Sequence, residues 1–497
     1  LKNLVPHGDG IRVVVTTTRN LDWESLGWQP ITVGVFEREQ SIALLCERTG
    51  DGDRDTADQI ADTLGDLPVA VTQAAATAKS GGYTLSEYIE RLNNHPLESS
   101  ISRLEGDDYC DAVGIALFMA YEQVLEQIRT IHPQQERIAV SLLGTLSLLA
   151  ASGVPSHWLF HLDEDSDTVR SALSLLRGNS IVQESSDGSK TLIHRLQGQV
   201  YRETYLSNQE KATEATRHAA SVLNEIDIER LADFEQERQK TSDLIEQIRS
   251  VASQTYSCLL FSDPTFFVTI TRALGHATDL GMPQLALTLA ESVTQAGEAL
   301  GPDNPNTLTS RDALAYAYLT AHRPIRAIDL YEQNLKERTR ILGPDHPDTL
   351  TSRSNLASAY QADGRTQKAI ALHEQNLTDR THILGPDHPD TLTTRNNLAY
   401  TYEAAGRLDD AIALYEQTLK DSTRILGPHH PDTLASRNNL AYAYQTAGRL
   451  DEAIALYEQT LKDSTRILGP HHPQTLTSRH NLANAYRAAG RLDEAIT

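Results

Sequence analysis

Apolar and small residues recur at helical spacing through the C-terminal part of the chain. Between residues 390 and 426 they stand three or four positions apart within each of two runs, which predicts two helices that pack on each other through one buried stripe each. We expect these helices over 392–405 and 408–426, with Asp390 and Thr391 as the N-cap of the first and Gly406 as its end. The stripe positions are Leu398, Ala399, Tyr402, Ala411 and Tyr415.

The same helix pair is repeated at a fixed period. The tripeptide Leu-Gly-Pro begins at Leu300, Leu342, Leu384, Leu426 and Leu468, which are 42 residues apart. Self-similarity at such a period indicates a solenoid, in which each unit buries its apolar face against its neighbours. The Leu-Ala-x-x-Tyr…Ala-x-x-x-Tyr pattern resembles the tetratricopeptide repeat, and the 42-residue unit resembles its kinesin-light-chain variety. We expect four complete units between about 303 and 470, an incomplete fifth, and a degenerate unit before them over 264–300.

Polar residues and tyrosines recur on the first helix of each unit, at positions expected to face an inner groove. Asparagine amides can donate to and accept from a peptide backbone, and tyrosine adds apolar area and a hydroxyl. The resemblance to kinesin-light-chain repeats implies that such asparagines hold an extended protein or peptide ligand. The alternative is a groove that is polar and merely solvated. The candidates are Asn355, Asn396, Asn397, Tyr400, Asn438, Asn439, Tyr442 and Asn481.

Histidines recur in the loops between units, which raises the question of a metal. They repeat because the loop repeats, and each loop places a histidine before a proline that starts a helix. We therefore expect a structural role and no metal site. These histidines are His346, His388, the pair His429-His430 and the pair His471-His472.

Composition narrows the classes of function. The 497 residues should form more than one domain, and the net charge of -23 argues against bulk nucleic-acid binding and against anionic membrane surfaces. The three cysteines have neither disulfide nor metal-ligand spacing, so we expect a cytoplasmic protein. The longest uncharged run, 138–154, is too short for a membrane span and predicts a buried helix. Because the chain begins at Leu1 and ends inside a repeat, we expect it to be part of a larger protein.

The N-terminal half mixes a strand, helices and a hairpin. Residues 12–18 are β-branched and predict a buried strand, and Asp187-Gly188 predicts the turn of a hairpin over 180–194. A further helix should begin near Leu196. The other predicted helices cover 37–49, 53–64, 67–79, 84–93, 107–130 and 134–151.

Three short motifs in this half resemble those of an NB-ARC domain, the nucleotide switch of STAND ATPases. Thr17-Thr18-Arg19 matches the sensor strand end, residues 65–68 (Gly-Asp-Leu-Pro) match the Gly-Leu-Pro-Leu motif, and 193–195 (Ile-His-Arg) match the Met-His-Asp motif. The resemblance implies that Thr18 and Arg19 sense a terminal phosphate, that Pro68 packs against adenine, and that His194 contacts the β-phosphate of ADP. Each residue also has an ordinary structural reading, such as a proline in the first turn of a helix.

The chain departs from the family at several points. Asp66, Val69 and Arg195 replace the usual residues of their motifs. No Gly-x-x-x-x-Gly-Lys-Ser/Thr stretch occurs, so the backbone cradle and lysine that hold phosphates are absent from the sequence. We therefore expect no catalytic residues and no cofactor in this chain, and ADP or ATP with Mg²⁺ only in an intact parent, which could be an ATPase.

The expected fold is mainly α, with the end of a P-loop NTPase, helical and winged-helix subdomains, and then an α-solenoid of 42-residue units. The predicted domains are 1–20 (last part of the nucleotide-binding α/β domain), 21–105 (helical ARC subdomain), 106–206 (winged helix), 207–262 (helical linker), 263–300 (degenerate repeat) and 301–497 (repeat array).

Three functions fit this organisation. The first is a signalling switch of the STAND class, for which the resemblance implies a setting in prokaryotic immunity or regulation. Its repeats would sense a protein or peptide ligand, and its winged helix would gate ADP/ATP exchange and homo-oligomerisation. The second is a non-enzymatic scaffold that binds extended peptides. The third is a transcription regulator, which the scarcity of basic residues near the candidate recognition helix disfavours.

Overall fold

The computed structural model describes residues 35–94, 111–163, 165–228, 234–254, 260–261, 263–470 and 472–496. The chain divides into two compact units, Leu1–Thr269 and Ile270–Thr497. The strand predicted over 12–18, together with Thr18 and Arg19, lies outside the described residues. The six domain boundaries proposed from the sequence stay a prediction.

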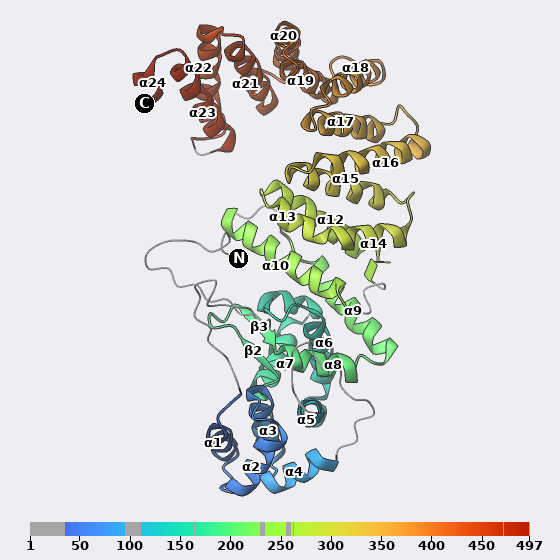
Figure 1. The fold of residues 1–497 in the computed structure, drawn as a ribbon, viewed down its shortest axis with the longest axis vertical. Helices are drawn as coiled ribbons and strands as arrows, with labels where there is room; N and C mark the ends of the chain where they lie inside the picture. The colour runs from blue at the N-terminus through green and yellow to red at the C-terminus, as the bar shows by residue number, and fades with distance from the viewer. Residues whose placement is uncertain are drawn as a thin grey trace, which may run out of the picture. The chain divides into compact units, whose positions relative to one another are not determined.

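The first unit begins with a group of helices that the sequence predicted. α1 packs on α2 and α3, α2 packs on α4, and α3 packs on α5 (Figure 1). In the turn before α3, Gly65 and Asp66 both adopt positive φ, and the Asp66 carboxylate accepts two hydrogen bonds from Nε of Arg38 at 3.1 and 3.0 Å. These helices are α1 (Arg38–Thr49), α2 (Arg54–Thr63), α3 (Pro68–Gly81), α4 (Leu85–Asn94) and α5 (Asp111–Ile131).

A small antiparallel sheet and its helices follow. The strand order is β1-β3-β2, and the predicted hairpin is confirmed: Val182 pairs with Ile193 and Glu184 with Thr191, around a turn where Gly188 has φ +71°. Trp158, in the 3-10 helix that follows β1, is fully buried. The elements are α6 (Pro133–Leu148), β1 (Val154–Pro155), η1 (Ser156–Leu162), α7 (Ser166–Gly178), β2 (Val182–Glu184), β3 (Lys190–Ile193) and α8 (Arg195–Thr204).

The uncharged run 138–154 lies mostly in α6, which is buried from Ile138 to Leu148 except for Val140. Within the described residues, no helix combines the length and the apolar character that a membrane span requires.

Two helices, α9 and α10, and then a helix pair precede the array in the chain. α9 packs on α6, and α12 spans the boundary between the two units. Residues 264–300, where the sequence predicts a degenerate repeat, form one helix followed by a helix interrupted near its start. These elements are α9 (Gln209–Asn224), α10 (Phe234–Ala252), α12 (Pro264–Asp279), α13 (Pro283–Ala286), η2 (Leu287–Leu289) and α14 (Ala290–Leu300).

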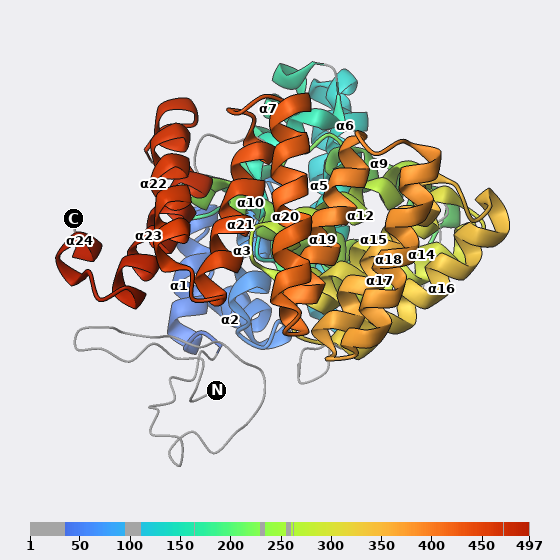
Figure 2. The same cartoon turned by 90° about the horizontal axis from the view of Figure 1, so that it is seen from above.

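The remainder of the second unit is a stack of helix pairs, as the 42-residue period predicts. Each helix packs on the one before it and the one after it (Figures 1 and 2). A typical core joins Leu398 and Tyr402 of one first helix, Tyr415 of its second helix and Leu440 of the next first helix. The first helices are α15 (Pro305–Thr320), α17 (Pro347–Ala362), α19 (Pro389–Ala404), α21 (Pro431–Thr446) and α23 (Pro473–Ala488). The second helices are α16 (Pro324–Leu342), α18 (Thr366–Ile383), α20 (Leu408–Ile425), α22 (Leu450–Ile467) and α24 (Leu492–Ile496).

The predicted N-cap of α19 is wrong. His388, not Asp390 or Thr391, is the N-cap: its Nδ1 accepts the backbone N–H of Asp390 at 3.2 Å, and Pro389 is the first helical residue. His346, His430 and His472 do the same for α17, α21 and α23. The structural role predicted for the loop histidines thus has a specific form, because a neutral imidazole supplies the acceptor that a helix N-terminus lacks.

The adjacent histidines of one loop allow a matched test of this role. We expect His430→Ala to lower the free energy of unfolding by about 1 kcal/mol, the usual effect of losing an N-cap acceptor. His429, which contacts Arg466 at the surface, should cost much less when changed to alanine. Urea denaturation followed by circular dichroism measures both variants. Equal losses for the two would contradict the capping role.

Candidate functional site

The first helices lie on the inner side of the stack. α15 contacts α17, α17 contacts α19, and α21 contacts α23. In the described part of the array, no two second helices of neighbouring units make a comparable contact. Since elements on the inner side of a curved stack approach one another most closely, the surface formed by the first helices is the inner face. We refer to it as the first-helix face.

A row of exposed tyrosines marks this face. Tyr316, Tyr400 and Tyr442 occupy the same position of three units and are 42%, 57% and 50% exposed. The unit between Tyr316 and Tyr400 has Ser358 at this position. Large aromatic side chains exposed on one face are typical of a surface that a partner covers. The sequence predicted Tyr400 and Tyr442, and Tyr316 was missed because the unit around it lacks the asparagine pair.

The candidate asparagines divide into two groups. Asn439 is exposed, and Asn355, Asn397 and Asn481 are half-buried. These four side chains are open at least in part to a ligand, and each follows the packing position between units by one residue.

Asn396 and Asn438 instead join one unit to the next. Nδ2 of Asn438 donates to Oγ of Ser478 at 2.8 Å, and Nδ2 of Asn396 donates to Oγ of Ser436 at 3.3 Å. Asn438 is only 7% exposed, so the prediction that it faces a ligand is wrong. The sequence signal that could have shown this is the serine 40 residues after each asparagine.

A recurring side-chain hydrogen bond joins each of four first helices to the second helix of the unit before it. The hydroxyl of Tyr402 donates to Glu374 of the preceding second helix at 2.6 Å, and the guanidinium of Arg407 lies 4.0 Å from the centre of its ring. Burial raises the pKa of Tyr402 to about 12, with a further rise from the bond to Glu374, so this hydroxyl stays a donor. The same tyrosine–glutamate bond recurs at Tyr360–Glu332, Tyr444–Glu416 and Tyr486–Glu458.

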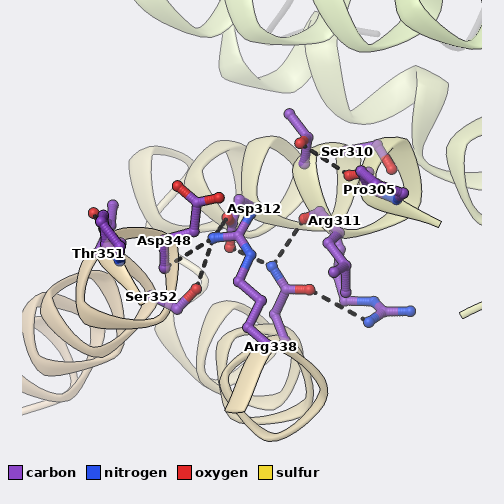
Figure 3. Close-up of polar contacts among 12 residues, drawn as sticks. Pro305, Ser310, Arg311, Asp312, Arg338, Asp348, Thr351 and Ser352 are labelled. Carbon is purple, nitrogen blue, oxygen red and sulfur yellow. Dashed lines mark hydrogen bonds and ion pairs between the residues drawn. The ribbon is translucent and has the colours of Figure 1, made fainter. Parts of the chain in front are cut away.

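A buried ionic network lies at the first of the complete units (Figure 3). Arg338 of α16 reaches between α15 and α17, where it pairs with Asp312 at 2.7 Å and donates to Oγ of Ser352 at 2.8 Å. Nδ2 of Asn334 donates to the same Asp312 carboxylate at 2.6 Å. Burial raises the pKa of Asp312, and the charge of Arg338 opposes that rise. Ion pairs and hydrogen bonds between helices thus support the first-helix face.

The two described nucleotide candidates lie in the first unit at helix N-termini. Pro68 is the first residue of α3 and is half-buried. His194 is exposed and is the N-cap of α8, where its Nδ1 accepts the N–H of Leu196 at 3.2 Å. The helices that carry them are joined inside the unit, since Nε2 of Gln197 donates to Oε1 of Gln73 at 2.9 Å.

A cavity of about 450 Å³ lies elsewhere in the first unit, among α5, α6, α8 and α9. Its walls include Tyr201 and Tyr205, whose rings stack 4.8 Å apart. Neither Pro68 nor His194 lines it. The structure thus gives both residues a helix-terminal role and leaves their contact with a nucleotide as a prediction.

Comparison with known proteins agrees with the repeat pattern. The family described as "Tetratricopeptide repeat" matches residues 322–378, 354–422, 405–464 and 434–497. Among solved structures, two forms of the nearly identical repeats of a putative kinesin light chain from Podosopora anserina are 32% and 37% identical over 40% and 39% of this chain. They are covered over 95% and 91% of their own length, with TM-scores of 0.36 and 0.35.

A STAND protein with a tetratricopeptide repeat sensor from Pyrococcus horikoshii is 13% identical over 93% of this chain and 65% of its own, with a TM-score of 0.34. A search of curated proteins finds no match. The repeat pattern, the stacked helix pairs and the family match agree, so the C-terminal part of this chain, residues 322–497, is an array of tetratricopeptide repeats.

Proposed function

We propose that the array binds an extended protein segment along its first-helix face. The observation that carries this proposal is the set of exposed tyrosines, Tyr316, Tyr400 and Tyr442, on helices that side-chain hydrogen bonds join to one another. A rigid surface loses little entropy on binding, and tyrosine is among the residues that contribute most to protein interfaces. The half-buried Asn355, Asn397 and Asn481 and the exposed Asn439 supply amides for the backbone of the bound segment.

The test uses the complete chain. Short peptides are selected from a displayed random library, and their affinity is measured by fluorescence anisotropy. We expect Tyr400→Ala and Tyr442→Ala each to weaken binding about tenfold or more, equivalent to roughly 1.4 kcal/mol, because each removes an exposed aromatic anchor.

Ile467→Ala is the matched control, since this residue is 38% exposed but lies at the end of a second helix. The control should bind as the wild type does. Unchanged affinity in both tyrosine variants would contradict the proposal.

A second function, a nucleotide-gated switch of the STAND class, is supported by the order of elements in residues 133–204. This part holds a helix, a short strand, two helices and a hairpin, with sheet order β1-β3-β2, and we interpret it as a winged helix. His194 directly follows the hairpin, as in the Met-His-Asp motif. In this proposal His194 and Pro68 contact ADP, exchange for ATP with Mg²⁺ accompanies opening and homo-oligomerisation, and the Gln73–Gln197 hydrogen bond helps to hold the closed state.

Such a switch requires that a ligand on the array changes the first unit. Hydrogen exchange of the complete chain, with and without a selected peptide, measures this coupling. The switch predicts faster exchange in α3 and α8 when the peptide is bound, and protection of the first turn of α8 when ADP is added. Unchanged exchange in both helices under both conditions would favour a plain scaffold.

A further inference from the structure

Arg311 differs from its counterparts in the next three units, whereas Arg479 of the last unit is exposed. At the equivalent position, Arg353, Arg395 and Arg437 are nearly buried, with side chains 9%, 6% and 6% exposed. Each forms an ion pair with an aspartate of its own second helix. The pairs are Arg353–Asp379 at 2.5 Å, Arg395–Asp421 at 2.8 Å and Arg437–Asp463 at 2.8 Å.

The corresponding carboxylate is engaged elsewhere in the unit of Arg311. Glu337 stands where the other units have aspartate, and it pairs with Arg340 at 2.9 Å. Within the described residues Arg311 has no ion pair. Its one hydrogen bond is long, 3.4 Å from Nη1 to Oδ1 of Asn334. In Figure 3 Arg311 reaches the Arg338–Asp312 network only through this hydrogen bond to Asn334, which donates to Asp312.

Arg311 instead lines a cavity of about 440 Å³ formed by residues of α14, α15 and α16 and the loop before α15. Val293, Leu314 and Leu330 make apolar parts of the wall. Burial lowers the pKa of Arg311, the direction expected for a cation withdrawn from water. The charges of Glu337 and Asp312 oppose this shift, but neither carboxylate forms an ion pair with Arg311, so a bound anion would add the close counter-ion that arginine has in the next three units.

The sequence of this interface differs from that of the next two interfaces. At the next two interfaces the matching space holds Arg338 and Arg380, which donate to hydroxyls of Ser352 and Thr394 at 2.8 and 3.0 Å. α14 carries Ala296 at that position, 42 residues before Arg338, and therefore has no arginine that could reach across this interface. Glu298 also lines the cavity, and it is exposed and forms no ion pair with Arg311.

We propose that this cavity binds a carboxylate that is attached to a short apolar group, with Arg311 as its counter-ion. A guanidinium presents paired donors that match a carboxylate, and the apolar wall fits an aliphatic group beside it. The group comes from the C-terminus or from an acidic side chain of a protein. The site is separate from the exposed tyrosines of the first-helix face, so it goes beyond the function proposed above and does not depend on it.

Three small probes distinguish the chemistry and its source. N-acetyl-leucine presents a C-terminal carboxylate, N-acetyl-glutamate α-amide presents a side-chain carboxylate, and N-acetyl-leucinamide has none. Calorimetric titration of the complete chain should give saturable one-site binding for at least one of the two carboxylates. The neutral amide should bind at least about tenfold more weakly, the discrimination expected when a charged partner is lost.

Two variants place the site. Arg311→Gln should weaken binding of the carboxylate probe at least about tenfold. Glu337→Asp should do the same while keeping the net charge and the fold, because it installs the aspartate that pairs with arginine in the other units. Arg424→Gln removes an exposed arginine and should bind as the wild type does.

Three results would each overturn the proposal. The first is the absence of saturable binding of either carboxylate to the wild type. The second is equal affinity for the amide, and the third is undiminished binding in Glu337→Asp. If Arg311→Gln fails to fold, Glu337→Asp still tests the proposal, because it changes the same site.

Discussion

Replacing Arg338 by serine is expected to lower the free energy of unfolding by about 3–5 kcal/mol. The substitution leaves Asp312 buried without its cation, and burial already raises the pKa of that carboxyl group. It also leaves the hydroxyl of Ser352 without its donor. Urea denaturation monitored by circular dichroism measures the loss.

The sequence of the later units suggests a second substitution that should restore the stability lost in Arg338→Ser. Later units have asparagine and serine at these two positions, as in Asn396 with Ser422 and Asn438 with Ser464. The double variant Asp312→Asn/Arg338→Ser copies that pair, and its new amide can donate to Ser352 as Asn438 donates to Ser478. We expect it to recover most of the lost stability, because removing both charges removes the unpaired one. A double variant as unstable as Arg338→Ser would contradict this explanation.

Acidification from pH 7 to pH 4 is expected to destabilise the chain by about 3 kcal/mol through His373 alone. Burial lowers the pKa of His373 to about 4, and its side chain is 1% exposed. In the unfolded chain the imidazole takes up a proton near its ordinary pKa of 6.5, whereas in the folded chain it stays neutral. The stability that this difference supplies is therefore complete above pH 6.5 and is lost as the pH falls toward 4.

His373→Tyr is the matched control, because Tyr331, Tyr415 and Tyr457 occupy the same buried position in the other units. Chemical denaturation of both proteins at several pH values isolates the contribution of one imidazole. The two curves of stability against pH should converge at high pH and separate below pH 6.5. Parallel curves across the acidic range would show that His373 is not the group responsible.

The repeat fold could be predicted from the sequence because the residues that determine it lie close together in the chain, within one unit. The stripe of Leu398 and Tyr402 and the glycine at 406 recur within a single unit, so one period is enough to place both helices. The capping histidines could not be predicted in the same way, because His388 is not among the preferred N-cap residues and Asp390 is.

The candidate site was harder to predict, because exposure depends on how units meet. Asn438 and Asn439 are neighbours of the same type, yet one is buried against Ser478 and the other is exposed. In the first unit, the turn signal at 187–188 predicted the hairpin, whereas the contact of Gln73 with Gln197 joins residues 124 positions apart and has no local signal.

The central claim is that the first-helix face binds an extended segment, and photo-crosslinking tests it most directly. A selected peptide carrying a benzophenone group is irradiated with the complete chain, and the linked residues are identified by mass spectrometry. The account predicts links to α17, α19 and α21, clustered around Tyr400 and Tyr442. Links confined to the second helices α18, α20 and α22, or to the first unit, would contradict it.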